Sequence, residues 1–235
     1  GRTDIAFELA DLSLMKDTEA LIERLLTTDR KIDVLINNAG ALFNEHSRTD
    51  EGLEQSYALL LLSPWRLTEA LKPLLVNAWG PARVINVVSG GMYAERLNLK
   101  RLNMAAEGYR GARAYAQCKR ALSVLTEIWA ERWADDNIVV NAMHPGWSDT
   151  PGVQKSLPLF RRITQLVLRS HKEGADTIVW MARSKQAALS SGKLFLDREP
   201  RSTYLLGNNV EQPDTRADLE PMLHSDFSAA LNTVN

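Results

Sequence analysis

Tyr115 and Lys119 stand four residues apart at the start of a helical pattern that runs on to Asp135. Residues four apart lie one above the other on the same face of a helix. A phenol has an ordinary pKa near ~10, and a neighbouring ammonium stabilises the phenolate and lowers that pKa. The pair therefore predicts a tyrosine that exchanges a proton with a substrate. Taken alone, the same spacing is also what an ordinary helix-surface pair gives.

Small and polar residues follow three apolar runs that are typical of buried strands. Residues 37–40 (Asn-Asn-Ala-Gly) close the run that begins at 32, Ser89 follows the run 83–88, and His144 with Pro145 follows the run 137–142. Ligands of open α/β sheets bind at the carboxyl ends of the strands. The alternatives are structural: a turn at 37–40, a turn cap at Ser89 and a structural His144.

The strand-like runs alternate with helical patterns, which predicts one α/β domain with a parallel sheet. The domain is expected to span residues 1–206, and the tail 207–235 is expected to form a surface helix or a frayed end. Ser13 is a candidate cap for the first helix, and Pro64 predicts a kink or register break. The expected strands are 5–10, 32–37, 83–88, 137–142 and 192–196, and the expected helices are 14–26, 50–77, 115–135, 157–170 and 173–184.

The amino-acid composition and the net charge narrow the class of protein. The 28 basic and 29 acidic residues leave no strong net charge, which argues against a nucleic-acid partner. The single cysteine fits a reducing compartment, and no apolar run approaches the roughly 18 residues of a membrane span. With no signal peptide visible, we expect a cytoplasmic location.

Four motifs, in this order, resemble those of the short-chain dehydrogenase/reductase superfamily. They are residues 37–40, Ser89, the Tyr115–Lys119 pair, and the Pro-Gly-x-x-x-Thr stretch 145–150. Four further stretches resemble one of its branches, the family member 12 type, and these are 89–92, 143–153, 173–177 and 191–198. The resemblance implies a Rossmann-like, doubly wound parallel sheet with helices on both faces, and an oxidoreductase that interconverts an alcohol and a carbonyl.

The resemblance also implies roles for single residues. Tyr115 is the acid or base, Lys119 lowers its pKa and holds the ribose of the cofactor, and Ser89 stabilises the carbonyl oxygen. The implied cofactor is NAD or NADP, with no metal. The residues implied to bind the cofactor are Asp11, Leu12, Asn38, Ala39, Gly40, Tyr115, Lys119, Pro145, Gly146, Trp147 and Thr150.

Two long segments, residues 92–113 and 147–160, are suited to covering a ligand, and we expect a small apolar alcohol or carbonyl compound as the substrate. The long helices of the resembling family often pack across a dimer axis, which makes a homodimer an expectation here. Trp129 and Trp133 then belong either to the core or to the subunit interface.

Two departures from the family pattern bear on the function. No Gly-x-x-x-Gly-x-Gly turn is present, so the sheet is expected to lack its first two βα units, about 60 residues at roughly 30 each. The strand 5–10 is then expected to be poorly supported and cofactor binding to be weak. Leu60 stands where the family has an asparagine that anchors a water, although the Leu60 carbonyl can still serve. The alternative function is therefore a weakly active or inactive relative that acts as a binding protein.

Overall fold

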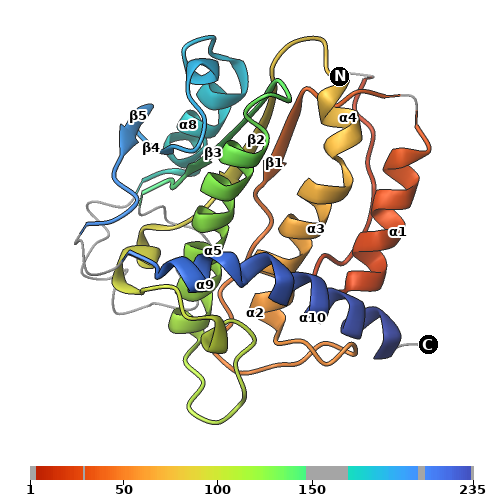
Figure 1. Cartoon of the computed structure of the whole chain (residues 1–235), viewed down its shortest axis with the longest axis vertical. Coiled ribbons are helices and arrows are strands. Elements are labelled where there is room, and N and C mark those ends of the chain that lie inside the picture. The colour runs from red at the N-terminus through yellow and green to blue at the C-terminus, as the bar shows by residue number, and fades with distance from the viewer. Residues whose placement is uncertain (1–3, 29, 147–168, 206–209, 234–235) are drawn as a thin grey trace.

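The computed structural model describes residues 4–28, 30–146, 169–205 and 210–233, and these contain one five-stranded sheet (Figure 1). The strand order is β1-β2-β3-β4-β5, with β1 to β4 parallel and β5 antiparallel to β4. The predicted α/β fold with a largely parallel sheet is confirmed. The strands are β1 (Val34–Asn37), β2 (Ala82–Val87), β3 (Ile138–Met143), β4 (Leu194–Leu196) and β5 (Glu199–Arg201).

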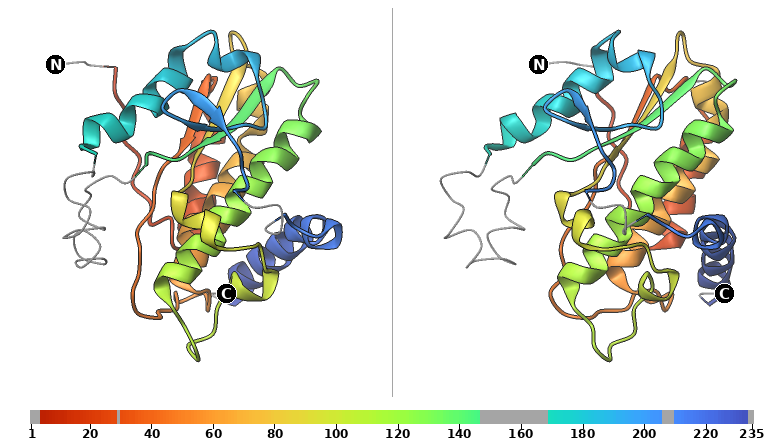
Figure 2. Two further views of the ribbon diagram at one scale, coloured as in Figure 1. Left: turned by 90° about the vertical axis from the view of Figure 1, so that its left-hand side faces the viewer. Right: turned by 60° about the vertical axis from the view of Figure 1, so that its left-hand side comes forward.

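Helices cover both faces of the sheet (Figures 1 and 2). The long helix α5 and the helices before β2 pack on one face, and α8 packs on the other. The helices are α1 (Met15–Leu26), α2 (Gln55–Tyr57), α3 (Ser63–Ala70), α4 (Lys72–Val76), α5 (Gly111–Arg132), α8 (His171–Arg183), α9 (Pro213–Ala217) and α10 (Leu219–Thr233). Short turns of other helix types are η1 (Ala58–Leu62), η2 (Gly90–Ala94), η3 (Leu99–Arg101) and η4 (Ala187–Leu189).

The two central strands are buried on both faces, which explains their continuous apolar sequences. Val84 and Val140 belong to the large core between the sheet and α5, whereas Ile85 and Met143 belong to the smaller core under α8. Successive residues of a strand point to opposite faces, so one strand supplies both cores. The carboxyl ends of β2 and β3 are thereby fixed from two sides.

The segment 5–10 is not a strand, which corrects the prediction. It is extended chain in which Ile5, Phe7 and Leu9 are 59%, 85% and 93% exposed. The alternation of apolar residues is typical of a strand, but a strand also needs a neighbour that completes its hydrogen bonds. Among the described residues, no strand lies beside this segment.

The predicted helix 50–77 is divided into α2, η1, α3 and α4. Its register changes in η1, a π-helical turn in which the Ser63 N–H donates to the Ala58 carbonyl. Pro64, at the start of α3, has no N–H to donate to the Leu60 carbonyl, so a regular α-helix cannot continue through this point. The register break predicted from Pro64 is confirmed, and the turn before the proline carries it.

A distant carboxylate, rather than Ser13, caps α1. Glu51 is buried, and it accepts hydrogen bonds from Met15 N at 2.6 Å and Lys16 N at 2.8 Å. The Ser13 hydroxyl donates instead to Asp11 Oδ1. A negative charge at a helix N-terminus satisfies free N–H groups and interacts favourably with the helix dipole. The predicted cap is therefore wrong, because the stronger acceptor arrives from 35 residues away.

The last described helix, α10, lies across the outer side of the helical layer (Figures 1 and 2). Leu219, Leu223 and Phe227, from which the helix was predicted, are buried in the large core. Trp129 and Trp133 are buried in the same core and stack on each other. Strand β5 was not predicted, and the predicted helix 157–170 falls largely outside the described residues. None of the described helices has the length and apolar character that a membrane span requires.

Candidate active site

Helix α5 places Tyr115 and Lys119, and its first residue fixes where the helix begins. Gly111 packs so tightly on the loop after β1 that a Cβ atom here would lie 1.8 Å from the Phe43 carbonyl oxygen. Only glycine allows this approach. The start of α5 is therefore held against the segment that follows Gly40, and Tyr115 stands one turn further along.

Ser89 stands at the carboxyl end of β2 and caps η2, where its hydroxyl accepts a hydrogen bond from Gly91 N at 3.3 Å. The same side chain lies near the Tyr115 phenol and acts to lower its pKa. Strand β2 and helix α5 thus bring two hydroxyl groups together at the edge of the sheet. Two hydroxyls in this arrangement can share the oxygen of a third molecule.

Lys119 is 3% exposed, and its Nζ donates to the Val87 carbonyl at 2.8 Å. The same Nζ lies 5.8 Å from the centre of the Tyr115 ring, and 3.8 Å from the position of a Cβ atom on Gly40. The structure therefore brings Gly40, Ser89, Tyr115 and Lys119 to one place. An ammonium in a dry site of this kind interacts strongly with any polar ligand that approaches it.

Burial governs the acid-base properties of the pair. It lowers the pKa of Lys119 to about 8. It also raises the pKa of Tyr115, although the hydrogen bond with Ser89 opposes this rise. The prediction of a lowered Tyr115 pKa is thus wrong for this structure, because removal from water disfavours the phenolate and the Lys119 ammonium is directed at Val87. The Tyr115 phenol therefore keeps its proton at neutral pH.

A chain of buried amides and hydroxyls supports this site across the sheet. Asn37 Nδ2 donates to Thr68 Oγ1 at 2.9 Å and to Asn86 Oδ1 at 2.7 Å, and Asn86 Nδ2 donates to Thr126 Oγ1 at 2.9 Å. The chain links β1 and β2 to helices α3 and α5. Buried amide groups need hydrogen-bond partners, and this chain supplies them for Asn37 and Asn86. Sequence reasoning missed Asn86, whose signal is a lone amide inside the β-branched run 83–88.

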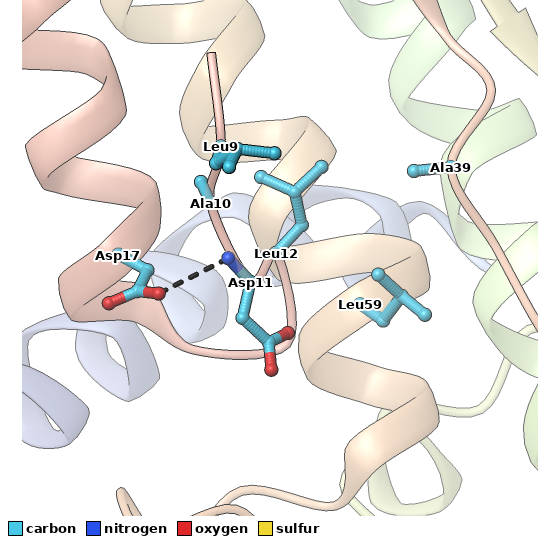
Figure 3. A pocket seen from close by; sticks show the side chains of 7 residues that line it. All are labelled: Leu9, Ala10, Asp11, Leu12, Asp17, Ala39 and Leu59. Atoms are coloured by element: carbon cyan, nitrogen blue, oxygen red, sulfur yellow. Dashed lines mark hydrogen bonds between the residues drawn. The ribbon is translucent and has the colours of Figure 1, made fainter.

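A surface pocket of about 600 Å³ lies where α1, η1 and the loop after β1 meet. Its lining includes three of the predicted cofactor residues, Asp11, Leu12 and Ala39, together with Leu59. Figure 3 shows Leu12 and Leu59 between Asp11 on one side and Ala39 on the other. Ser13 donates to Asp11 through both its N–H and its hydroxyl, and these bonds lower the pKa of the Asp11 carboxyl. The pocket thus offers apolar surface beside a carboxylate.

Asn38 and Gly40 are exposed on the loop that carries Ala39 from this pocket towards Lys119. The Leu60 side chain packs against this loop, since a Cβ atom on Gly40 would lie 2.9 Å from Leu60 Cδ2. A side chain at position 40 would therefore displace the Leu60 methyl group. Leu60 is fully buried, and its side chain supplies no polar group to the site.

Pro145 and Gly146 follow β3 beside Ser89. The adjacent His144 is buried, and its Nδ1 lies 3.8 Å from the position of a Cβ atom on Gly90. Gly146 has φ of 72°, and its N–H donates to His144 Nδ1 at 3.3 Å. The predicted residues Trp147 and Thr150 lie outside the described residues.

A model of the family described as short chain dehydrogenase matches residues 2–158. Over 206 residues the chain is 41% identical to dehydrogenase/reductase SDR family member 12 of Homo sapiens, covering 87% of this chain and 64% of that protein. Over 196 residues it is 30% identical to retinol dehydrogenase 14 of Mus musculus, covering 80% of this chain and 57% of that protein. The chain thus spans somewhat under two thirds of the length of these relatives.

A solved structure of similar fold is that of 4-hydroxyisoleucine dehydrogenase complexed with NADH. Its TM-score is 0.60 at 21% identity, over 79% of this chain and 74% of that chain. At this identity the likeness is one of fold.

Proposed function

The chain belongs to the short-chain dehydrogenase family, and we propose that it is an oxidoreductase that interconverts an alcohol and a carbonyl with NAD or NADP. The observation that carries the proposal is the convergence of Ser89, Tyr115 and the buried Lys119 at the carboxyl end of β2, where Lys119 Nζ lies 5.8 Å from the centre of the Tyr115 ring and bonds the Val87 carbonyl. These three side chains come from β2 and α5, and the sequence alone singled them out. Relatives of this family supply the precedent for the reaction.

The residues present fit a nicotinamide cofactor. The pocket lined by Asp11, Leu12 and Ala39 offers apolar surface for a planar ring next to an acceptor for hydroxyl groups. The loop continues to Gly40, which is exposed and has no side chain, so a ligand can approach its backbone closely. Lys119 would hold the ribose, and Pro145 and Gly146 would line the nicotinamide side. The cofactor would supply or accept a hydride.

In this proposal Tyr115 donates a proton to the carbonyl oxygen of the substrate. Burial raises the pKa of Tyr115, so the phenol is protonated at neutral pH and is poised to act as an acid. Ser89 donates a second hydrogen bond to the same oxygen and stabilises the charge that develops there.

The proposed substrate is a small apolar aldehyde, ketone or alcohol. Retinol dehydrogenase 14 of mouse, by its name, acts on an apolar alcohol, and it is 30% identical to this chain over 196 residues. The side of the site next to Ser89 includes the half-buried ring of Tyr93, which meets His144 edge-on. Apolar and aromatic surface of this kind suits an apolar substrate.

Replacing Tyr115 with phenylalanine tests the proposal. Turnover of a panel of apolar aldehydes with NADH or NADPH, followed at the nicotinamide absorbance, is expected to fall about a thousandfold, because general acid catalysis is lost. Fluorescence titration with the same cofactors is expected to give a Kd within about twofold of the parent, because the hydroxyl is not needed for binding. Tyr57→Phe is the matched control: its buried hydroxyl bonds Asp226, away from Ser89. Turnover that survives in the Tyr115 variant would refute the catalytic assignment.

Leu60 supports a second candidate, a binding protein that has lost most of its turnover. The Leu60 side chain places methyl groups where the asparagine expected from the family pattern would place a polar amide. Saturable cofactor binding by the parent chain, with no turnover of any aldehyde or alcohol in the panel, would favour this function. Turnover that depends on Tyr115 would exclude it.

A further inference from the structure

The turn between β4 and β5 is built from two residues with left-handed backbone. Asp197 has φ of 55° and Arg198 has φ of 63°, and Leu196 pairs with Glu199 across the turn. Two-residue hairpins prefer this conformation, but they usually place Asn, Asp or Gly in it. A bulky arginine in this region is uncommon and requires support from its surroundings.

Both side chains of the turn make paired contacts between an arginine and a carboxylate. Arg169 donates to Asp197 from Nη1 at 2.6 Å and from Nη2 at 2.8 Å. Arg198 donates to Asp176 of α8 from Nε at 2.7 Å and from Nη2 at 2.5 Å. All four side chains are between 30% and 53% exposed, so neither pair is expected to contribute much stability. Two-bond geometry of this kind instead fixes the orientation of the guanidinium.

Only one of the two pairs reaches the candidate active site. Arg169 Nη1 lies 3.4 Å from the Pro145 carbonyl oxygen, to which it donates. The guanidinium also lies against Gly146, where a Cβ atom would stand 2.8 Å from Nε. The Arg198 pair instead joins the turn to α8, where Arg198 N also donates to Thr177 Oγ1 at 3.3 Å.

We propose that Asp197 is a positioning residue that holds Arg169 against Pro145 and Gly146 and thereby raises the affinity of the site for the nicotinamide cofactor. This inference rests on the proposed function, in which those two residues line the nicotinamide side. An arginine side chain has several rotatable bonds, and a fixed partner removes much of that freedom before a ligand arrives. Asp197 thus acts through Arg169 and touches neither substrate nor cofactor.

The test compares Asp197→Asn with Asp176→Asn in the full chain. Asparagine keeps the left-handed backbone at position 197 and removes the charge that orients Arg169. Fluorescence titration with NADH is expected to give a Kd raised about fivefold in D197N, because a two-bond charged contact is lost, and unchanged within about 1.5-fold in D176N. The ratio of the Kd of D197N to the Kd of the parent is expected to shrink at about 1 M salt, because charges more than ~3 Å apart are screened there.

Hydrogen exchange of the Gly146 amide provides a readout without cofactor. Exchange is expected to be faster in D197N than in the parent and unchanged in D176N, with similar melting temperatures for the two variants. Equal effects of the two variants on Kd and on exchange, or no effect of either, would overturn the inference. A parent chain that binds neither NADH nor NADPH would refute the proposed function and the cofactor part of this inference. A parent that binds, with no difference for D197N, would refute this inference alone.

Discussion

The two ends of the candidate site are built in different ways. At the Tyr115 end, Lys119 is 3% exposed and its contacts come from β2 and the loop after β1. At the Asp11 end, the preceding Leu9 is 93% exposed, and the Asp11 contacts to Ser13 and Asp17 lie within six residues in sequence. Buried contacts from distant segments fix a side chain to a single geometry, whereas local surface contacts leave room for adjustment. The proposed chemistry thus lies at the rigid end.

Gly111→Ala is expected to have the largest effect, because it displaces the rigid end as a whole. The new Cβ would lie 1.8 Å from the Phe43 carbonyl oxygen, which belongs to the backbone and cannot rotate away. The free energy of unfolding is expected to fall by about 4 kcal/mol, at the upper end of single substitutions. Urea denaturation measures this change.

Gly80→Ala is the matched control for this substitution. No atom lies within 4 Å of the Cβ position on Gly80, and the residue is not in the left-handed region. Its free energy of unfolding is expected to stay within about 0.5 kcal/mol of the parent. If Gly111→Ala behaved in the same way, the start of α5 would not be held by this contact.

The Tyr115 end of the site could be predicted from the sequence because the patterns that mark it lie within single strands and a single helix. The β-branched runs 83–88 and 137–142 mark strands that are buried on both faces, and Tyr115 with Lys119 lie one turn apart on a single helix. The failures involve partners that are distant in sequence. Glu51 reaches α1 from another segment, and the alternating residues 5–10 read as a strand although no neighbour completes it.

The raised Tyr115 pKa was missed for a related reason. The spacing to Lys119 predicts proximity, but the direction in which an ammonium points and the extent of burial depend on the packed structure. Likewise, β5 was missed because two residues other than glycine adopt a left-handed turn at 197–198. Asp197 pairs with Arg169 and Arg198 pairs with Asp176 to support that turn. Neither pair can be predicted from a local sequence pattern.

Burial of Lys119 makes the stability of the fold depend on pH. The pKa of Lys119 in the folded chain is about 8, whereas its ordinary value is 10.5. Below pH 8 both the folded and the unfolded chain hold the proton, and burial of the charge destabilises the fold in full. Between pH 8 and 10.5 the folded chain releases the proton first, so stability rises with pH. The gap between the two pKa values corresponds to about 3 kcal/mol.

Comparison with Lys119→Met isolates this contribution, because the variant has no proton to release at that position. The difference in free energy of unfolding between the parent and the variant, measured by urea denaturation from pH 7 to 10, is expected to shift in favour of the parent as pH rises. Lys100→Met is the control, since Lys100 is exposed on η3 and its ammonium stays in water in both states. A difference that stayed constant with pH would show that the site of Lys119 is not dry.

Asp11→Ala is expected to have the smallest effect on stability, because it changes only the Asp11 end of the site, whose contacts are local and exposed. Asp11 is exposed, and its carboxylate accepts two bonds from Ser13. Loss of these surface bonds is expected to lower the free energy of unfolding by less than about 1 kcal/mol. Because Ser13 lowers the Asp11 pKa, this contribution is present above the ordinary value of 3.8 and is lost as pH falls through the folded value.

Cofactor affinity separates the two roles of Asp11. Ser13→Ala keeps the carboxylate and removes one local bond, so its Kd for NADH is expected to stay near the parent value, while that of Asp11→Ala rises about threefold to tenfold with the loss of one charged hydrogen bond. Equal Kd values for the two variants would mean that Asp11 acts on its own loop and not on a ligand. A loss of stability as large as that of Gly111→Ala would contradict the comparison itself, since the surface end would then be as firmly built as the interior one.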